Sequence, residues 1–150
     1  MGTENLVNVE RTLTKTLLSW SAASMVLGTT IALVGNQRDS KSMTEFGRQT
    51  AAWGAVDAVI AGAGLISQKR RGELTEEQTQ EQGRKLHKLL VINTIADVGY
   101  VAGGVALVSR GRRKKSTLRM GAGDGLAIVL QGAFLFGLDL SQAMRLRRNL

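Results

Sequence analysis

The chain contains 150 residues with a net charge of +8, no Cys, no Pro and a single His. The lack of Cys excludes disulfides, thiolate nucleophiles and cysteine metal sites, and one His excludes paired imidazole ligands. A length of 150 residues is typical of one domain. The 20 Lys and Arg residues are confined to connecting segments and tails, so a mean hydropathy near zero conceals long stretches without basic residues.

Four stretches with few or no charges divide the chain. An α-helix rises about 1.5 Å per residue, so about 20 residues cross a hydrocarbon core of about 30 Å. Each stretch is about this long, and none contains Lys or Arg. A soluble amphipathic bundle would carry a charge in nearly every turn of its wet face. We therefore predict an all-α, four-span transmembrane bundle in one domain, 1–150, with spans at about 17–35, 48–67, 89–109 and 121–144.

The residues before the first span form a short amphipathic segment. Leu6, Val9, Leu13 and Leu17 recur at helical spacing, and charged side chains occupy other faces. We expect this segment to lie at the membrane interface or to extend the first helix. Trp20, near one end of the first span, is expected at the interfacial depth that an indole ring favours.

Small residues recur at four-residue spacing within the spans, a pattern that lets transmembrane helices approach closely. The predicted ridges are Ser24, Gly28 and Ala32 in the first span, Gly54, Ala58 and Gly62 in the second, and Gly99 and Gly103 in the third. The fourth span opens with three glycines, Gly121, Gly123 and Gly125. They lack the spacing of a dinucleotide-binding fingerprint, so we predict a flexible or close-packed helix start.

The segment 72–88, between the second and third spans, has the composition of a soluble helix. Thr75 and Gln78 have the spacing of a capping box, and Glu81 and Lys85 form an i, i+4 pair of opposite charge. We predict a helix that begins near Thr75 outside the bilayer and continues into the third span. His87, at the mouth of that span, is predicted to be an interfacial residue rather than a catalyst.

A dense basic run follows the third span. It consists of Arg110, Arg112, Arg113, Lys114 and Lys115. Because the run lies between two spans and has no interleaved aromatic residue for base stacking, we predict contact with anionic lipid headgroups and no nucleic-acid binding. The two sides of the membrane would carry 11 and 9 basic residues, so the positive-inside rule does not orient the protein.

Polar residues near the centres of the spans are the candidates for a functional site. Asp57 and Asp97 are each the only charge in their span, Asn93 precedes Asp97 by one helical turn, and Gln131 lies near the middle of the fourth span. A bundle that turns these faces inward would gather all four at similar depth. Ionising a carboxylate there costs about 2.5–3.5 kcal/mol, so such groups tend to be protonated, paired or hydrated.

This predicted midplane cluster has two interpretations. In the functional one, it is a proton or cation site. In the structural one, a protonated Asp donates a hydrogen bond across a packing seam, which contributes about 0.6–2 kcal/mol. Asp139, nearer the basic C-terminal end, is expected to pair with Arg145 or to lie at the interface. The chain contains no hydrolytic triad, metal-ligand cluster or cofactor motif, so we expect neither an enzyme nor a cofactor.

Three phrases carry a resemblance to a known family. They are Trp53-Gly-Ala-Val-Asp-Ala-Val-Ile-Ala-Gly, Asn93-Thr-Ile-Ala-Asp-Val-Gly-Tyr-Val-Ala-Gly-Gly and Leu130-Gln-Gly-Ala-Phe-Leu-Phe-Gly-Leu-Asp. Over about residues 17–144 the chain resembles a family of small, uncharacterised bacterial four-helix membrane proteins. Segments 72–88 and 110–119 show no matching pattern. The resemblance implies four spans and a bacterial origin, and it implies no activity.

Sequence alone thus predicts a multi-pass protein of the bacterial inner membrane without enzymatic activity. The leading interpretation is a packing or assembly subunit of a membrane complex or homo-oligomer, in contact with itself or with another membrane protein. The alternative is a proton- or cation-coupled small transporter or channel component that uses the midplane carboxylates. A soluble, basic, nucleic-acid-binding α-domain remains only if the chain does not enter a membrane.

Overall fold

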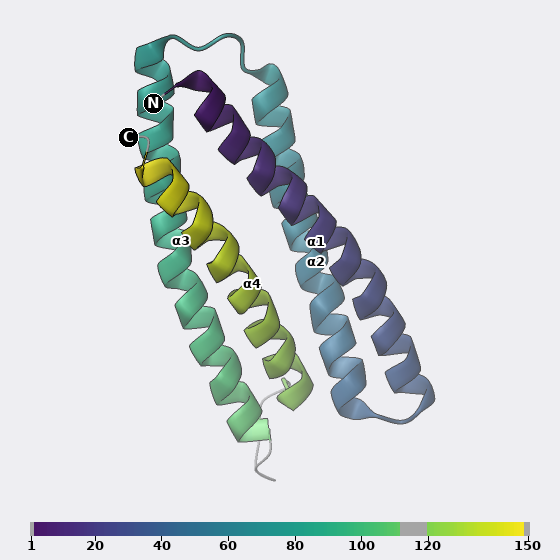
Figure 1. Ribbon diagram of the computed structural model, residues 1–150. Coiled ribbons are helices and arrows are strands. Elements are labelled where there is room, and N and C mark those ends of the chain that lie inside the picture. Colours follow the sequence, from purple (N-terminus) through teal and green to yellow (C-terminus); the bar gives the residue numbers. More distant parts are fainter. Residues whose placement is uncertain (1, 112–119, 149–150) are drawn as a thin grey trace.

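A computed structural model describes residues 2–111 and 120–148 of the chain, and these form four long helices (Figure 1). The helices are α1 (Thr3–Gln37), α2 (Lys41–Arg70), α3 (Glu76–Gly111) and α4 (Ala122–Arg147). The described residues contain no strand. All four helices are long and apolar enough to cross a membrane. The predicted all-α bundle with four membrane-spanning helices is confirmed.

Two helical hairpins make up the bundle. α1 packs along α2, and α3 packs along α4. The hairpins meet mainly through α2 and α4, and α4 lies between α3 and the α1–α2 pair (Figure 1). Within the described residues, no Cα atom of α2 lies within 8 Å of a Cα atom of α3. Both ends of the chain and the α2–α3 connection lie at one end of the bundle, and the α1–α2 turn lies at the other (Figure 1).

The amphipathic N-terminal segment is the beginning of α1 rather than a separate helix. At 35 residues, α1 is about 52 Å long and exceeds the thickness of a hydrocarbon core. Its apolar face does not point to lipid, because Leu6 and Val9 are buried in a cluster with Leu90 of α3 and with Ala143 and Leu146 of α4. This cluster closes the end of the bundle that holds the termini.

Small residues make the α1–α2 seam tight, as the ridge Ser24, Gly28 and Ala32 predicts. A Cβ atom on Gly28 would lie 2.5 Å from the Ala51 nitrogen, and one on Gly47 would lie 2.3 Å from the Ala32 nitrogen. No side chain fits at either position, because the obstructing atoms belong to backbone. The seam therefore depends on glycine at both places.

The ridges predicted for the second and third spans are partly wrong. Gly54 packs against α1, but Cβ atoms on Gly62, Gly99 and Gly103 would meet nothing within 4 Å. The close contact of α3 is made by the next residue, Gly104, whose Cβ would lie 2.8 Å from the Gly125 carbonyl of α4. Successive helical residues are about 100° apart around the axis, so a register error of one residue selects a different face.

The start of α4 is close-packed. A Cβ atom on Gly123 would lie 2.1 Å from the Ser42 carbonyl oxygen. Two carboxylates accept hydrogen bonds from the free N–H groups of this helix end: Asp124 from Gly121 at 2.9 Å, and Glu45 of α2 from Gly123 at 3.4 Å. Negative charge is favourable at a helix N-terminus. Glu45 therefore fixes α4 against α2, and Asp124 caps its own helix and lies 3.5 Å from Arg48 of α2.

The start of α3 matches its prediction. The Gln78 N–H donates to Thr75 Oγ1 at 3.3 Å, and the Thr75 N–H donates to Gln78 Oε1 at 3.0 Å, which completes the capping box. One turn later, Lys85 lies 2.7 Å from Glu81. The hydrogen bond and charge of Lys85 lower the pKa of Glu81 below its ordinary value.

Burial in this fold is the reverse of that in a soluble domain. The fully buried side chains include Asp57, Thr79, Asp124 and Ser21, whereas large apolar side chains on all four helices are exposed. Among them are Val26, Leu33, Val59, Ile92, Ile95 and Leu126. A water-soluble fold would bury such residues, while a hydrocarbon solvent accepts them on the outside and requires polar groups to pair inside. The described surface is therefore suited to lipid.

Candidate functional site

A groove opens along the bundle where α2 and α3 stay apart. Its volume is about 410 Å³. All four helices line it. Apolar side chains cover most of its length, and polar or charged side chains lie between them. The polar lining comprises Glu10, Thr14, Asp57, Ser67, Gln68, Arg71, Asn93, Asp97 and Asp139. The groove is the candidate functional site because it brings carboxylates from all four helices into one space.

Asp57 is held on the α4 side of this groove. Its side chain is 1% exposed, and its Oδ2 atom accepts a hydrogen bond from the Gln131 amide of α4. The amide oxygen of Gln131 in turn accepts the Trp20 indole N–H at 2.8 Å. Trp20 also stacks on Phe134, with ring centroids 3.9 Å apart. Asp57 is thus linked to both α4 and α1.

This arrangement places the Trp20 indole inside the bundle. The indole lies near the middle of the 35-residue α1 and bonds to a polar group of the bundle interior. α1 extends well beyond the apolar span on its N-terminal side, so a residue near the end of the hydrophobic stretch is far from the end of the helix. The interfacial depth of Trp20 stays a prediction.

Within the described part of the chain, Asp97 contributes to the groove a buried carboxylate oxygen without a hydrogen-bond donor. Its side chain is 3% exposed, and no described residue donates a hydrogen bond to its Oδ2 atom. It lies within electrostatic range of Asp57. A buried acceptor without a donor costs about 1–3 kcal/mol, and more when it is charged. Asp97 can therefore bind a proton, or accept a hydrogen bond from a group outside the chain.

Asp139 belongs to the same group, and its predicted pairing with Arg145 or place at the interface stays a prediction. It is buried and lines the groove. Its carboxylate lies within electrostatic range of Asp97 and beside the Asn93 amide. The signal for this position was present in the sequence: Asp139 follows Gln131 by eight residues, about two turns, so both occupy one face of α4.

The four predicted cluster residues lie in one region of the fold. Asp57, Asn93 and Asp97 line the groove, and Gln131 reaches it through its bond to Asp57. Asn93 is exposed on the groove side of α3 rather than buried. Within residues 2–111 and 120–148, no three His, Cys, Asp or Glu side chains gather where they would hold a metal ion. The carboxylates line the groove at separate points.

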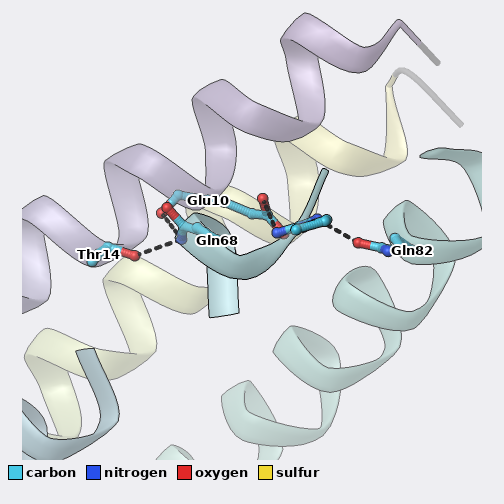
Figure 2. Close-up of polar contacts among 5 residues, drawn as sticks. Glu10, Thr14, Gln68 and Gln82 are labelled. Atoms are coloured by element: carbon cyan, nitrogen blue, oxygen red, sulfur yellow. Dashed lines mark hydrogen bonds and ion pairs between the residues drawn. The ribbon is translucent and has the colours of Figure 1, made fainter. Parts of the chain in front are cut away.

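A polar network closes the end of the groove near the chain termini (Figure 2). Arg71 Nη2 donates to both carboxylate oxygens of Glu10, at 2.8 and 2.7 Å, and Arg71 Nη1 donates to Gln82 of α3. The Gln68 amide donates to Thr14 Oγ1 at 3.0 Å. The network joins α1, α2 and α3 at a level where α2 and α3 have no backbone contact. Sequence reasoning missed it, because Glu10 and Arg71 are 61 residues apart.

Two aromatic rings bridge the groove at its inner end. Trp53 of α2 and Tyr100 of α3 meet edge to face, with centroids 5.6 Å apart and an interplanar angle of 69°. Both rings line the groove, and the buried Trp53 indole nitrogen has no hydrogen-bond partner among the described residues. The groove therefore has a charged network at one end and an aromatic pair at the other.

Of the basic run that follows α3, only Arg110 belongs to the described residues. Arg110 is exposed near the end of α3. The other four members, Arg112, Arg113, Lys114 and Lys115, lie outside the described residues. The contact with anionic lipid headgroups therefore stays a prediction.

Four apolar helices, long enough to cross a membrane, around a groove that carries carboxylates define this chain as a multi-pass membrane protein. Residues 16–140 match DUF6992, a family of unknown function, and the chain belongs to that family. The expectation of an uncharacterised family is confirmed. No curated protein and no solved structure matches the chain.

Proposed function

We propose that this protein is a non-enzymatic, multi-pass protein of the bacterial inner membrane that takes up a cation at the groove carboxylates, as a small transporter or channel component. In the simplest case the cation is a proton. The observation that carries the proposal is Asp97, whose Oδ2 atom is buried in the groove and has no hydrogen-bond donor among the described residues. A purely structural Asp is expected to have found such a donor within the bundle.

Asp57 illustrates the contrast. Its bond to Gln131 ties α2 to α4, which is what an interhelical packing role requires. Asp97 and Asp139 instead line the groove as buried carboxylates, with Asp57 within electrostatic range of Asp97 and Asp97 within electrostatic range of Asp139. Interacting like charges in a site of low dielectric favour uptake of a positive charge. The geometry therefore supports cation uptake over packing as the role of Asp97.

The experiment is proton flux into liposomes that hold the purified protein under an imposed pH gradient. We expect flux with the wild type, a large loss with Asp97→Asn, and no loss with the control Asp39→Asn, which changes an exposed acid in the α1–α2 turn. The amide keeps the size of the carboxylate and removes its titration. Absence of flux in folded wild-type protein, or undiminished flux in folded Asp97→Asn, would overturn the proposal.

An assembly role is the second candidate, and one observation favours it. Gly62, Gly99 and Gly103 would leave a Cβ atom in open space, so helix faces with the small residues typical of close packing have no partner within the described monomer. Sedimentation of the wild type in detergent against Gly99→Leu/Gly103→Leu tests this role. A stable oligomer that the double substitution dissociates would support assembly, and a monomeric wild type would exclude self-assembly.

A further inference from the structure

We infer that the groove binds an amphipathic organic ammonium ion, with its charged nitrogen at Asp97 and its apolar part along the groove walls. The inference rests on the proposed uptake of a cation and names the class of that cation. Three features of the groove together match an ammonium ion with an apolar body: carboxylates without basic partners, apolar walls and an aromatic pair.

The charge of the groove favours a cation. Among the described lining residues, Arg71 is the only basic one, and its guanidinium is bound to both oxygens of Glu10. Asp57, Asp97 and Asp139 are left without a basic partner in the groove. An ammonium N–H would supply the donor that Asp97 Oδ2 lacks, and a charge-assisted hydrogen bond is stronger than a neutral one.

The walls of the groove favour an organic ion over an inorganic one. Leu13, Leu17, Leu90, Leu135 and Leu138 line it between the polar levels. Such walls offer no ligands to replace the water of a metal ion, and the carboxylates do not gather at one point within the described residues. They do match the apolar part of an amine. Trp53 and Tyr100 line the same groove, and Tyr100 follows Asp97 by about one turn of α3. A cation within about 6 Å of a ring centre is attracted to the ring.

The size and opening of the groove agree with this class of ligand. A volume of about 410 Å³ lies within the range of about 300–1,000 Å³ that is usual for small-molecule sites, and a proton alone needs no such space. Three lining side chains, Ile60, Leu89 and Tyr100, are also about half exposed on the outer surface. The groove therefore opens sideways between α2 and α3, toward lipid.

A sideways opening admits two sources of the same chemistry. One is a small hydrophobic amine that partitions into the membrane. The other is the ammonium headgroup of a lipid such as phosphatidylethanolamine, with its chains outside the groove. Both would place an ammonium nitrogen at Asp97 and apolar carbon against the walls, so the shared chemistry defines the site.

The test is calorimetric titration of the purified full chain in dodecyl maltoside, which carries no amine. The probes are 2-phenylethylammonium, its neutral analogue 2-phenylethanol, and methylammonium, which has the charge without the ring. We expect 2-phenylethylammonium to bind at least about tenfold more tightly than either, the scale of one charge-assisted hydrogen bond. Asp97→Asn should remove this preference, while Asp97→Glu should retain part of it and Asp39→Asn all of it.

A second variant keeps the test decisive if Asp97→Asn does not fold. Tyr100→Leu retains an apolar wall and removes the ring, so it should weaken 2-phenylethylammonium more than 2-phenylethanol. Added phosphatidylethanolamine that competes with the probe, where phosphatidylglycerol does not, would identify the lipid headgroup as the source. Lack of competition, with the probe still bound, would identify a small amine.

Equal binding of the three probes, or an ammonium preference unchanged by Asp97→Asn and by Tyr100→Leu, would overturn the inference. Its failure is distinguishable from that of the proposed function. Asp97-dependent proton flux in liposomes without ammonium binding leaves the cation site in place and rejects the organic ligand. If folded wild-type protein shows neither proton flux nor ammonium binding, both the proposed function and this inference are rejected.

Discussion

Gln131 donates a hydrogen bond from its side-chain amide to the Asp57 carboxylate, across the interface of α4 and α2. The same amide accepts the Trp20 indole N–H of α1. One side chain thus joins three helices, at the interface through which the two hairpins chiefly meet. It also gives Asp57 the partner that Asp97 lacks.

Replacing Gln131 by Leu should therefore destabilise the bundle. The substitution leaves a buried carboxylate without its donor and an indole N–H without its acceptor, and an orphaned buried polar group costs about 1–3 kcal/mol. Thermal unfolding in detergent measures the effect. Gln80→Leu, at an exposed position of α3 outside the apolar span, is the matched control and should change the melting temperature little. Equal effects of the two substitutions would mean that the Gln131 bridge contributes no stability.

Two glycines of α2 should respond oppositely to the same change. A Cβ on Gly47 would lie 2.3 Å from the Ala32 nitrogen and 2.5 Å from the Gly28 oxygen, whereas one on Gly62 meets nothing within 4 Å. Gly47→Ala should lower stability by about 1–3 kcal/mol, because α1 must move away. Gly62→Ala should leave it unchanged or raise it by up to about 1 kcal/mol, because alanine loses less entropy in a helix. Parallel melting curves decide the comparison, and a common shift would contradict the described α1–α2 register.

Arg71 should matter more than its neighbour Arg70. The Arg71 and Glu10 side chains are only 18% and 17% exposed and form a two-pronged ion pair, while Arg70 is exposed. Arg71→Ala leaves Glu10 half-buried without its partner and should reduce the free energy of unfolding by about 1–3 kcal/mol. Arg70→Ala should have almost no effect. If the double variant Glu10→Ala/Arg71→Ala were as unstable as the sum of the single ones, the pair would not be coupled.

The absence of native Cys permits a direct test of topology. Arg38, in the α1–α2 turn, and Glu73, in the α2–α3 connection, are both exposed. These two connections lie at opposite ends of the bundle (Figure 1). In sealed vesicles of one orientation, a membrane-impermeant maleimide should label only one of Arg38→Cys and Glu73→Cys until the vesicles are opened. Labelling of both in intact vesicles would contradict a membrane-spanning α2.

Much of the candidate site was visible in the sequence as single residues. Asp57 and Asp97 were identified because each is the only charge in its span, and Asn93 and Gln131 because of their depth. Glu10 and Arg71 could not be identified, since nothing local distinguishes a charge that reaches across the bundle from one that faces water. Asp139 was not assigned to the cluster, although it shares a face of α4 with Gln131, because its nearness to the basic C-terminus favoured another interpretation.

What the sequence determined by itself is local. Four stretches without basic residues determine the number of helices that can span a membrane, because a helix must satisfy its own backbone in hydrocarbon. The Thr75–Gln78 capping box sets the start of α3 through bonds three residues apart. Tertiary structure alone decided which glycines are in contact, which carboxylates share a space, and that α2 and α3 stand apart. These features depend on how two hairpins rotate and meet through α2 and α4. Because a helix changes face every residue, this rotation sets which side chains line the groove and which face lipid.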